Sequence, residues 1–77
     1  MDAEQAIRLM DEGNTLVNYK DGVRIKKNGE GYIIMSANAD TVIIFDLYKT
    51  DRNQIWGKDY AIRFSTSNMV VLPEEDE

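Results

Sequence analysis

The fold is decided by Val23-Arg24-Ile25-Lys26-Lys27-Asn28-Gly29-Glu30-Gly31-Tyr32-Ile33-Ile34-Met35. In residues 23–26 apolar and basic side chains alternate, which is typical of a strand with one face in water. Asn28-Gly29 favours a tight turn, because glycine adopts the left-handed backbone that such turns need. Residues 32–35 are apolar and read as the returning strand, so the segment predicts a β-hairpin.

Further strand-like segments stand on both sides of this hairpin along the chain. Residues 15–19 are expected to pair with it through the Lys20-Asp21-Gly22 turn, and residues 41–48 to form a strand after the polar loop 36–40. The remaining predicted strands are 60–64, with Tyr60, Ile62 and Phe64 pointing inward, and the short edge strand 69–72 before Pro73. Because most connections are short, the sequence predicts an antiparallel meander.

A helix is predicted before the strands, over residues 2–12. Asp2 is a favourable N-cap with Gln5 three residues later, and Gly13 stands where a left-handed residue ends a helix most easily. The apolar side chains along one stripe of this helix are Ala3, Ala6, Ile7 and Met10. The predicted class is therefore α+β, with one N-terminal helix packed on a roughly five-stranded antiparallel sheet.

The third and fourth predicted strands carry apolar side chains on both faces. Residues 33–34 and 42–45 do not alternate, and a strand is buried on both faces only between two covering layers. One short helix covers one side, so the sheet must either curl into a barrel or pack against a second subunit. We expect a homodimer, because 77 residues without a cysteine provide little mass for two layers and no disulfide.

Acidic residues are concentrated at the two ends of the chain. The formal net charge is −5, and Pro73 is followed by Glu74, Glu75, Asp76 and Glu77. We expect one domain over residues 1–73 and a disordered acidic tail over 74–77, which is either simply solvated or attracts a basic partner. The predicted helix adds four more acids, Asp2, Glu4, Asp11 and Glu12. The predicted partner-binding residues are these four helix acids, the four acids of the tail and Trp56.

Trp56 and the basic hairpin each allow more than one interpretation. Trp56 is the only tryptophan and lies in a long polar connection predicted over residues 49–58, where it either anchors the loop on the core or is exposed as a binding hot spot. Arg24 and Lys26 share one strand face, which is a solvated face, an anion site or a nucleic-acid site. We expect no direct nucleic-acid binding, because the chain is acidic overall.

Few of the groups that enzymes use near neutral pH occur in the sequence. It has no histidine and no cysteine, which removes the commonest proton-transfer group, the thiol nucleophile and the soft metal ligands. Gly29-Glu30-Gly31 lacks the following helix of a phosphate-binding loop. Asp51-Arg52-Asn53 lacks the alternating ligands of a calcium loop. We therefore expect no enzymatic activity, no cofactor and no metal.

The sequence also predicts no membrane segment and no secretion signal. Met1 is followed by Asp2 and Glu4 and not by a basic region and an apolar run. The longest apolar stretch, residues 42–45, is far too short to cross a bilayer. Because the absence of cysteine also suits a reducing compartment, we expect a cytoplasmic protein.

Ala6-Ile7-Arg8-Leu9-Met10-Asp11-Glu12-Gly13, followed at once by strands, resembles the opening of small phage proteins of the Thoeris anti-defence type. The resemblance implies a small phage or mobile-element protein with a helix-then-sheet order, in a family whose members act as oligomeric sponges for nucleotide-derived signals. A basic residue and a tryptophan usually follow the glycine in that family, whereas Asn14-Thr15-Leu16-Val17 stand here. No binding residue is therefore carried over.

Two functional hypotheses follow. The first is a non-enzymatic, acidic inhibitor that binds a host protein by charge, including one that normally grips nucleic acid, because carboxylates on a rigid scaffold can occupy the cations meant for phosphates. The alternative is an oligomeric sponge that holds a nucleotide-derived ligand with the basic hairpin. The identity of the partner is not encoded in any motif of the chain.

Overall fold

The computed structural model describes residues 1–36 and 41–73, and it confirms the α+β class. Helix α1 (Ala3–Asp11) is followed by strands β1 (Thr15–Asn18), β2 (Arg24–Asn28), β3 (Gly31–Met35), β4 (Thr41–Ile44), β5 (Leu47–Asp51), β6 (Gln54–Gly57), the 3₁₀ helix η1 (Lys58–Tyr60), β7 (Ile62–Ser65) and β8 (Met69–Val71). The strands form a five-stranded sheet in the order β4-β3-β2-β1-β8 and a three-stranded sheet in the order β5-β6-β7. Every strand pair is antiparallel.

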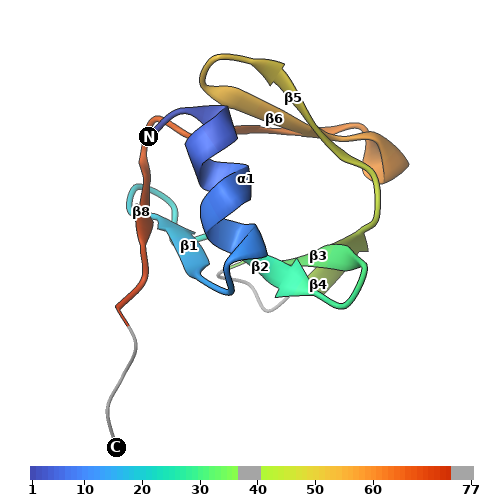
Figure 1. Cartoon of the computed structure of the whole chain (residues 1–77), viewed down its shortest axis with the longest axis horizontal. Helices are drawn as coiled ribbons and strands as arrows, with labels where there is room; N and C mark the ends of the chain where they lie inside the picture. Colours follow the sequence, from blue (N-terminus) through green and yellow to red (C-terminus); the bar gives the residue numbers. More distant parts are fainter. Residues whose placement is uncertain (37–40, 74–77) are drawn as a thin grey trace, which may run out of the picture.

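Helix α1 begins and ends as its sequence predicts. The Asp2 carboxylate accepts a hydrogen bond from the Gln5 backbone N–H at 2.8 Å, and Gly13 follows the helix with a φ of 100°. The stripe formed by Ala3, Ala6 and Met10 is fully buried. Figure 1 shows the helix between the two sheets, with β1 and β2 on one side and the β5–β6 hairpin on the other.

The central hairpin also forms as predicted. Gly29 adopts a φ of 62° in the turn between β2 and β3, and Gly22 one of 80° in the turn between β1 and β2. Ile25 on β2 lies opposite Ile34 on β3, and both side chains are buried with Leu16 of β1 in the core. This inner face of the five-stranded sheet packs against the helix.

The other face of the five-stranded sheet carries the second set of apolar side chains. Ile33 lies opposite Ile43. A Cβ added to Gly31 would lie 3.1 Å from Phe45 Cδ1 and 3.3 Å from Ile43 Cγ2, so the Phe45 ring packs over Gly31 beside Ile43. Ile43 and Phe45 remain 39% and 61% exposed. The helix and the second sheet thus cover the inner face of the five-stranded sheet. The homodimer remains a prediction, and it concerns only the outer face.

The prediction of one continuous strand over residues 41–48 is wrong. The chain bends at Phe45 and Asp46, so that β4 belongs to the five-stranded sheet and β5 to the three-stranded one. The Asp59 carboxylate accepts hydrogen bonds from the backbone N–H groups of Phe45, at 3.2 Å, and Asp46, at 3.0 Å. These bonds, that from Phe45 foremost, lower the pKa of Asp59. The bend therefore depends on an acid thirteen residues further along the chain.

Two other predictions in this half of the chain are wrong. The polar connection over residues 49–58 is the β5–β6 hairpin, in which Ile55 is fully buried. Tyr60 does not begin a strand pointing inward: it ends the 3₁₀ helix η1, before Ala61 with its φ of 53°, and is 56% exposed. Ile62 and Phe64 do belong to β7 and pack against the core as predicted.

Part of the predicted loop 36–40, from residue 37 on, and the acidic tail 74–77 lie outside the described residues. Within the described ranges, no helix has both the length and the apolar character that a membrane-spanning segment requires.

The burial of Ile55 gives a direct test of the second sheet. We expect Ile55→Ala to lower the free energy of unfolding by about 2–5 kcal/mol, because it removes a fully buried side chain from the core. The neighbouring exposed residue on the same strand provides a control, and Gln54→Ala should change this free energy by less than about 0.5 kcal/mol. Urea denaturation followed by circular dichroism measures both values. Equal effects of the two substitutions would contradict the β5–β6 hairpin.

Candidate functional site

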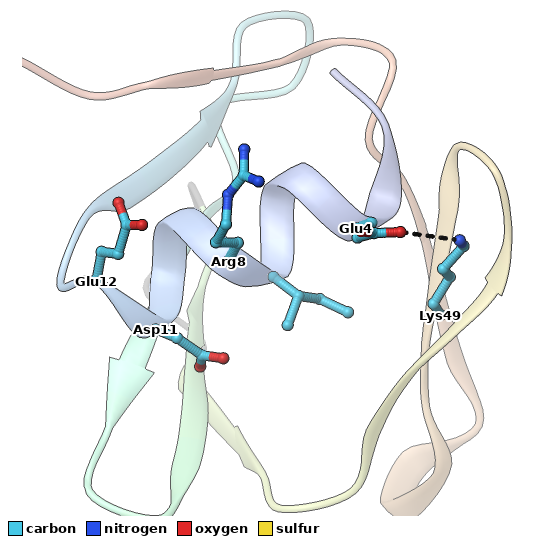
Figure 2. Close-up of a pocket in the computed structure, with 6 residues that line it drawn as sticks. Glu4, Arg8, Asp11, Glu12 and Lys49 are labelled. Atoms are coloured by element: carbon cyan, nitrogen blue, oxygen red, sulfur yellow. Dashed lines mark ion pairs between the residues drawn. The ribbon is translucent and has the colours of Figure 1, made fainter.

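A groove runs along the polar side of helix α1, between the helix and β5. Its volume is about 460 Å³. The residues that line it are Glu4, Ile7, Arg8, Asp11, Glu12 and Lys49. Ile7 is half-buried and packs against the core, so it supplies an apolar surface between charged neighbours. Figure 2 shows the labelled side chains distributed along the helix, with Lys49 reaching in from β5.

The two ends of this groove differ in how their charges are paired. At the N-terminal end, the Glu4 carboxylate lies 3.6 Å from Lys49 Nζ (Figure 2). Both side chains are largely exposed, so this ion pair contributes little to stability. The helix spacing suggests an interaction of Glu4 with Arg8, whereas the ion pair in the structure is with Lys49, because β5 lies beside the first turn. Lys49 is the groove residue that helical periodicity alone could not identify.

Asp11 belongs to a cluster that ties the C-terminal end of the helix to the hairpin. Its carboxylate accepts a hydrogen bond from the Tyr32 hydroxyl at 2.8 Å and lies 3.5 Å from Lys27 Nζ. Lys27 Nζ also stands 4.7 Å from the centroid of the Tyr32 ring, within the range of a cation–π interaction. Burial, followed by the hydrogen bond to Asp11 and the charge of Asp11, raises the pKa of Tyr32 to about 12.

Glu12 is the exposed carboxylate at the C-cap of the helix. Among the described residues, no side-chain hydrogen bond or ion pair involves it. The C-terminal end of a helix carries a partial negative charge, so an acid there is unfavourable by about 0.3–1 kcal/mol when exposed. Asp2, at the opposite end, has the role of N-cap and is favourable. Glu12 is therefore the helix acid whose position the fold itself does not explain.

The predicted binding residues do not form one surface. The groove brings together Glu4, Asp11 and Glu12. Trp56 lies elsewhere: it is half-buried on β6, directly between Tyr48 of β5 and Arg63 of β7, on the opposite face of the strand from Ile55. Glu74, Glu75, Asp76 and Glu77 lie outside the described residues.

The groove has an open surface that carries carboxylates and cations. In the described parts of the chain, no three acids stand close enough together to hold a metal ion. What the arrangement offers is a set of fixed charges around an apolar patch.

No protein family model, no curated protein and no solved structure matches the chain.

The Tyr32–Asp11 contact predicts a pH dependence at the alkaline end. Tyrosine in an unfolded chain loses its proton near pH 10, whereas Tyr32 in the folded protein does so near pH 12. The folded state therefore holds this proton more tightly, and the stability that it contributes is complete below about pH 10 and is lost as the pH rises to about 12.

Absorbance titration of the tyrosinates, with circular dichroism to confirm the folded state, measures this shift. We expect Tyr32→Phe to remove a titration step near pH 12. Asp11→Asn should lower the Tyr32 pKa but leave it above its ordinary value, because burial is the largest cause of the shift. A wild-type titration curve that Tyr32→Phe leaves unchanged above about pH 11 would contradict the contact.

Proposed function

We propose that this protein is a small, non-enzymatic binding protein that inhibits a larger host protein by presenting carboxylates from helix α1 to a basic surface. The source is taken to be a phage or mobile element, as the resemblance of residues 6–13 implies. The partner is a protein whose lysines and arginines are exposed for binding, including one that normally contacts the phosphates of a nucleic acid.

The observation that carries this proposal is the position of Glu12. An exposed acid at the C-cap of α1 opposes the helix dipole, and no cation among the described residues forms an ion pair with it. Asp11, one residue earlier, is also at this unfavourable end, but Lys27 and Tyr32 hold it in one orientation. Binding and active sites often place charges at positions that reduce stability, which is a trade-off between stability and activity.

The groove supports recognition by a long basic side chain. Lysine and arginine have apolar stems that can lie along Ile7 while their charged ends approach the carboxylates at the end of the helix. Arg8 lies in the same groove and repels a second cation in its middle, whereas Lys49 is already paired with Glu4. The groove would thus select a partner by the positions of its cations as well as by the sign of their charge.

The alternative, a sponge for a nucleotide-derived ligand, receives less support. Lys27 is engaged with Asp11 and Tyr32 on the inner side of the hairpin, whereas Arg24 and Lys26 share the outer row with Met35 and Ile33. The basic residues of the hairpin are therefore divided between two faces and do not converge on one phosphate.

A pair of single charge reversals tests the proposal. Glu12 and Glu30 are both exposed glutamates at the ends of secondary-structure elements, so Glu12→Lys and Glu30→Lys change the net charge equally. The partner is first captured from the source cell with the wild-type protein, identified by mass spectrometry, and then titrated by calorimetry. We expect Glu12→Lys to weaken binding by about 1.5 kcal/mol or more, which is the lower end of the range for close charge pairs at an interface. Glu30→Lys should have a much smaller effect.

The same substitution should leave the fold intact or slightly stabilise it. Replacing an acid by a cation at the C-cap favours the helix dipole by about 0.3–1 kcal/mol, so a loss of binding cannot be attributed to unfolding. Binding should also weaken as salt is added, because the contact is between exposed charges. Equal losses with Glu12→Lys and Glu30→Lys would indicate attraction by net charge alone and would contradict a site on the helix.

A further inference from the structure

The outer face of the five-stranded sheet carries a continuous apolar patch at the end formed by β3 and β4. Ile33 and Ile43 lie directly opposite each other, and Met35 follows Ile33 on the same face. The Phe45 ring covers Gly31 next to Ile43. No helix or strand of residues 1–36 and 41–73 covers Ile43 or Phe45, which keep 39% and 61% of their surface in water. Contiguous apolar side chains of this kind mark an interaction surface.

Charges of opposite sign flank this patch on its two sides. On one side β2 projects Arg24 and Lys26, which pair in register with Met35 and Ile33. On the other side Asp46 directly follows Phe45, and Asp59 binds the backbone N–H groups of both residues at the end of the edge strand β4. These hydrogen bonds keep the pKa of Asp59 low. The patch is thus bordered by two cations along β2 and by two acidic residues, Asp46 and Asp59, at the end of β4.

We infer that this face binds a second copy of the chain, with a two-fold axis passing through the apolar patch. A two-fold axis that lies between the two sheets and runs along the strands exchanges the β2 side and the β4 side of the patch, so the cations of each copy face the acids of the other, in two equivalent contacts. The apolar side chains of both sheets then pack face to face, as in a sandwich of two sheets. A pairing centred on β2 would instead oppose like charges and is disfavoured.

A second copy fits this face better than a nucleic acid does. Affinity for a nucleic-acid backbone grows with the number of phosphates neutralised, and Arg24 and Lys26 are the two cations on the described strands of this face. The patch itself is made mainly of aliphatic side chains, and the chain carries a net charge of −5. The surface complementary to this face is a protein surface with an apolar centre and carboxylates at its margin. A second copy of the chain has such a surface.

The inferred interface is independent of the proposed function. Helix α1 packs on the inner face of the same sheet, so pairing through the outer face leaves the helix groove open in both copies. The failure of one idea therefore does not imply the failure of the other, because one concerns the molecular mass of the isolated protein and the other concerns binding to a different protein.

Sedimentation equilibrium over a range of concentrations tests the pairing. We expect the wild-type protein to reach twice the mass of its 8.8 kDa chain. Phe45→Glu should raise the dissociation constant of the dimer about 30-fold, as for a hot-spot residue. Tyr19→Glu is the matched control, because Tyr19 is 62% exposed and lies at the other end of the sheet; it should leave the mass unchanged.

A charge-swap mixture identifies the orientation of the two copies. Arg24→Glu with Lys26→Glu opposes like charges in its own dimer, and so does Asp46→Lys; each protein alone should be monomeric. When they are mixed, both contacts are between opposite charges, and a heterodimer should form. Circular dichroism confirms that each variant is folded. A wild-type protein that stays monomeric at every concentration, a dimer unaffected by Phe45→Glu, or a mixture that remains monomeric would each overturn the inference.

Discussion

The structure depends on how closely helix α1 approaches the two sheets. Ala3, Ala6 and Met10 have no exposed surface, and the two alanines let the helix backbone come close to the strands. Its first turn is also held by polar contacts: the Ala3 backbone N–H donates to the Arg52 carbonyl at 2.7 Å, and the buried Thr66 hydroxyl donates to the Met1 carbonyl at 2.8 Å. Because the helix contacts both sheets, its position also determines which side chains face outward along the groove.

This arrangement has a consequence for the outer face of the five-stranded sheet. A chain of this length buries only about 60% of the surface that it exposes when unfolded. Helix α1 and the second sheet both pack on the inner side of the five-stranded sheet. Nothing is left in the described ranges to cover Ile43 and Phe45. Because the chain is short, the helix lies between the two sheets, and the apolar outer face of the five-stranded sheet is left for a second molecule.

Local signals predicted the elements that depend on neighbouring residues. Asp2 and Gly13 identified the helix ends, and the turns at Gly22 and Gly29 identified the first hairpins, because caps and tight turns are determined within a few positions. The bend at Asp46 could not be predicted, since it requires Asp59 to reach back to two backbone N–H groups. The sequence pattern does not indicate strand β6 either, because four residues with one buried side chain give almost no periodic signal.

In the candidate site too, local sequence predicted some features, and the others depend on residues distant in the chain. Helical periodicity placed Glu4, Asp11 and Glu12 on the exposed side of α1, but the partners of two of them, Lys49 and Tyr32, come from strands that only the fold brings near. Residues 1–73 carry ten acids against nine bases, so the number of charges says little about binding by this domain. Asp11 is compensated within the fold, whereas Glu12 opposes the helix dipole without a described partner, and position therefore singles out the carboxylate that composition could not.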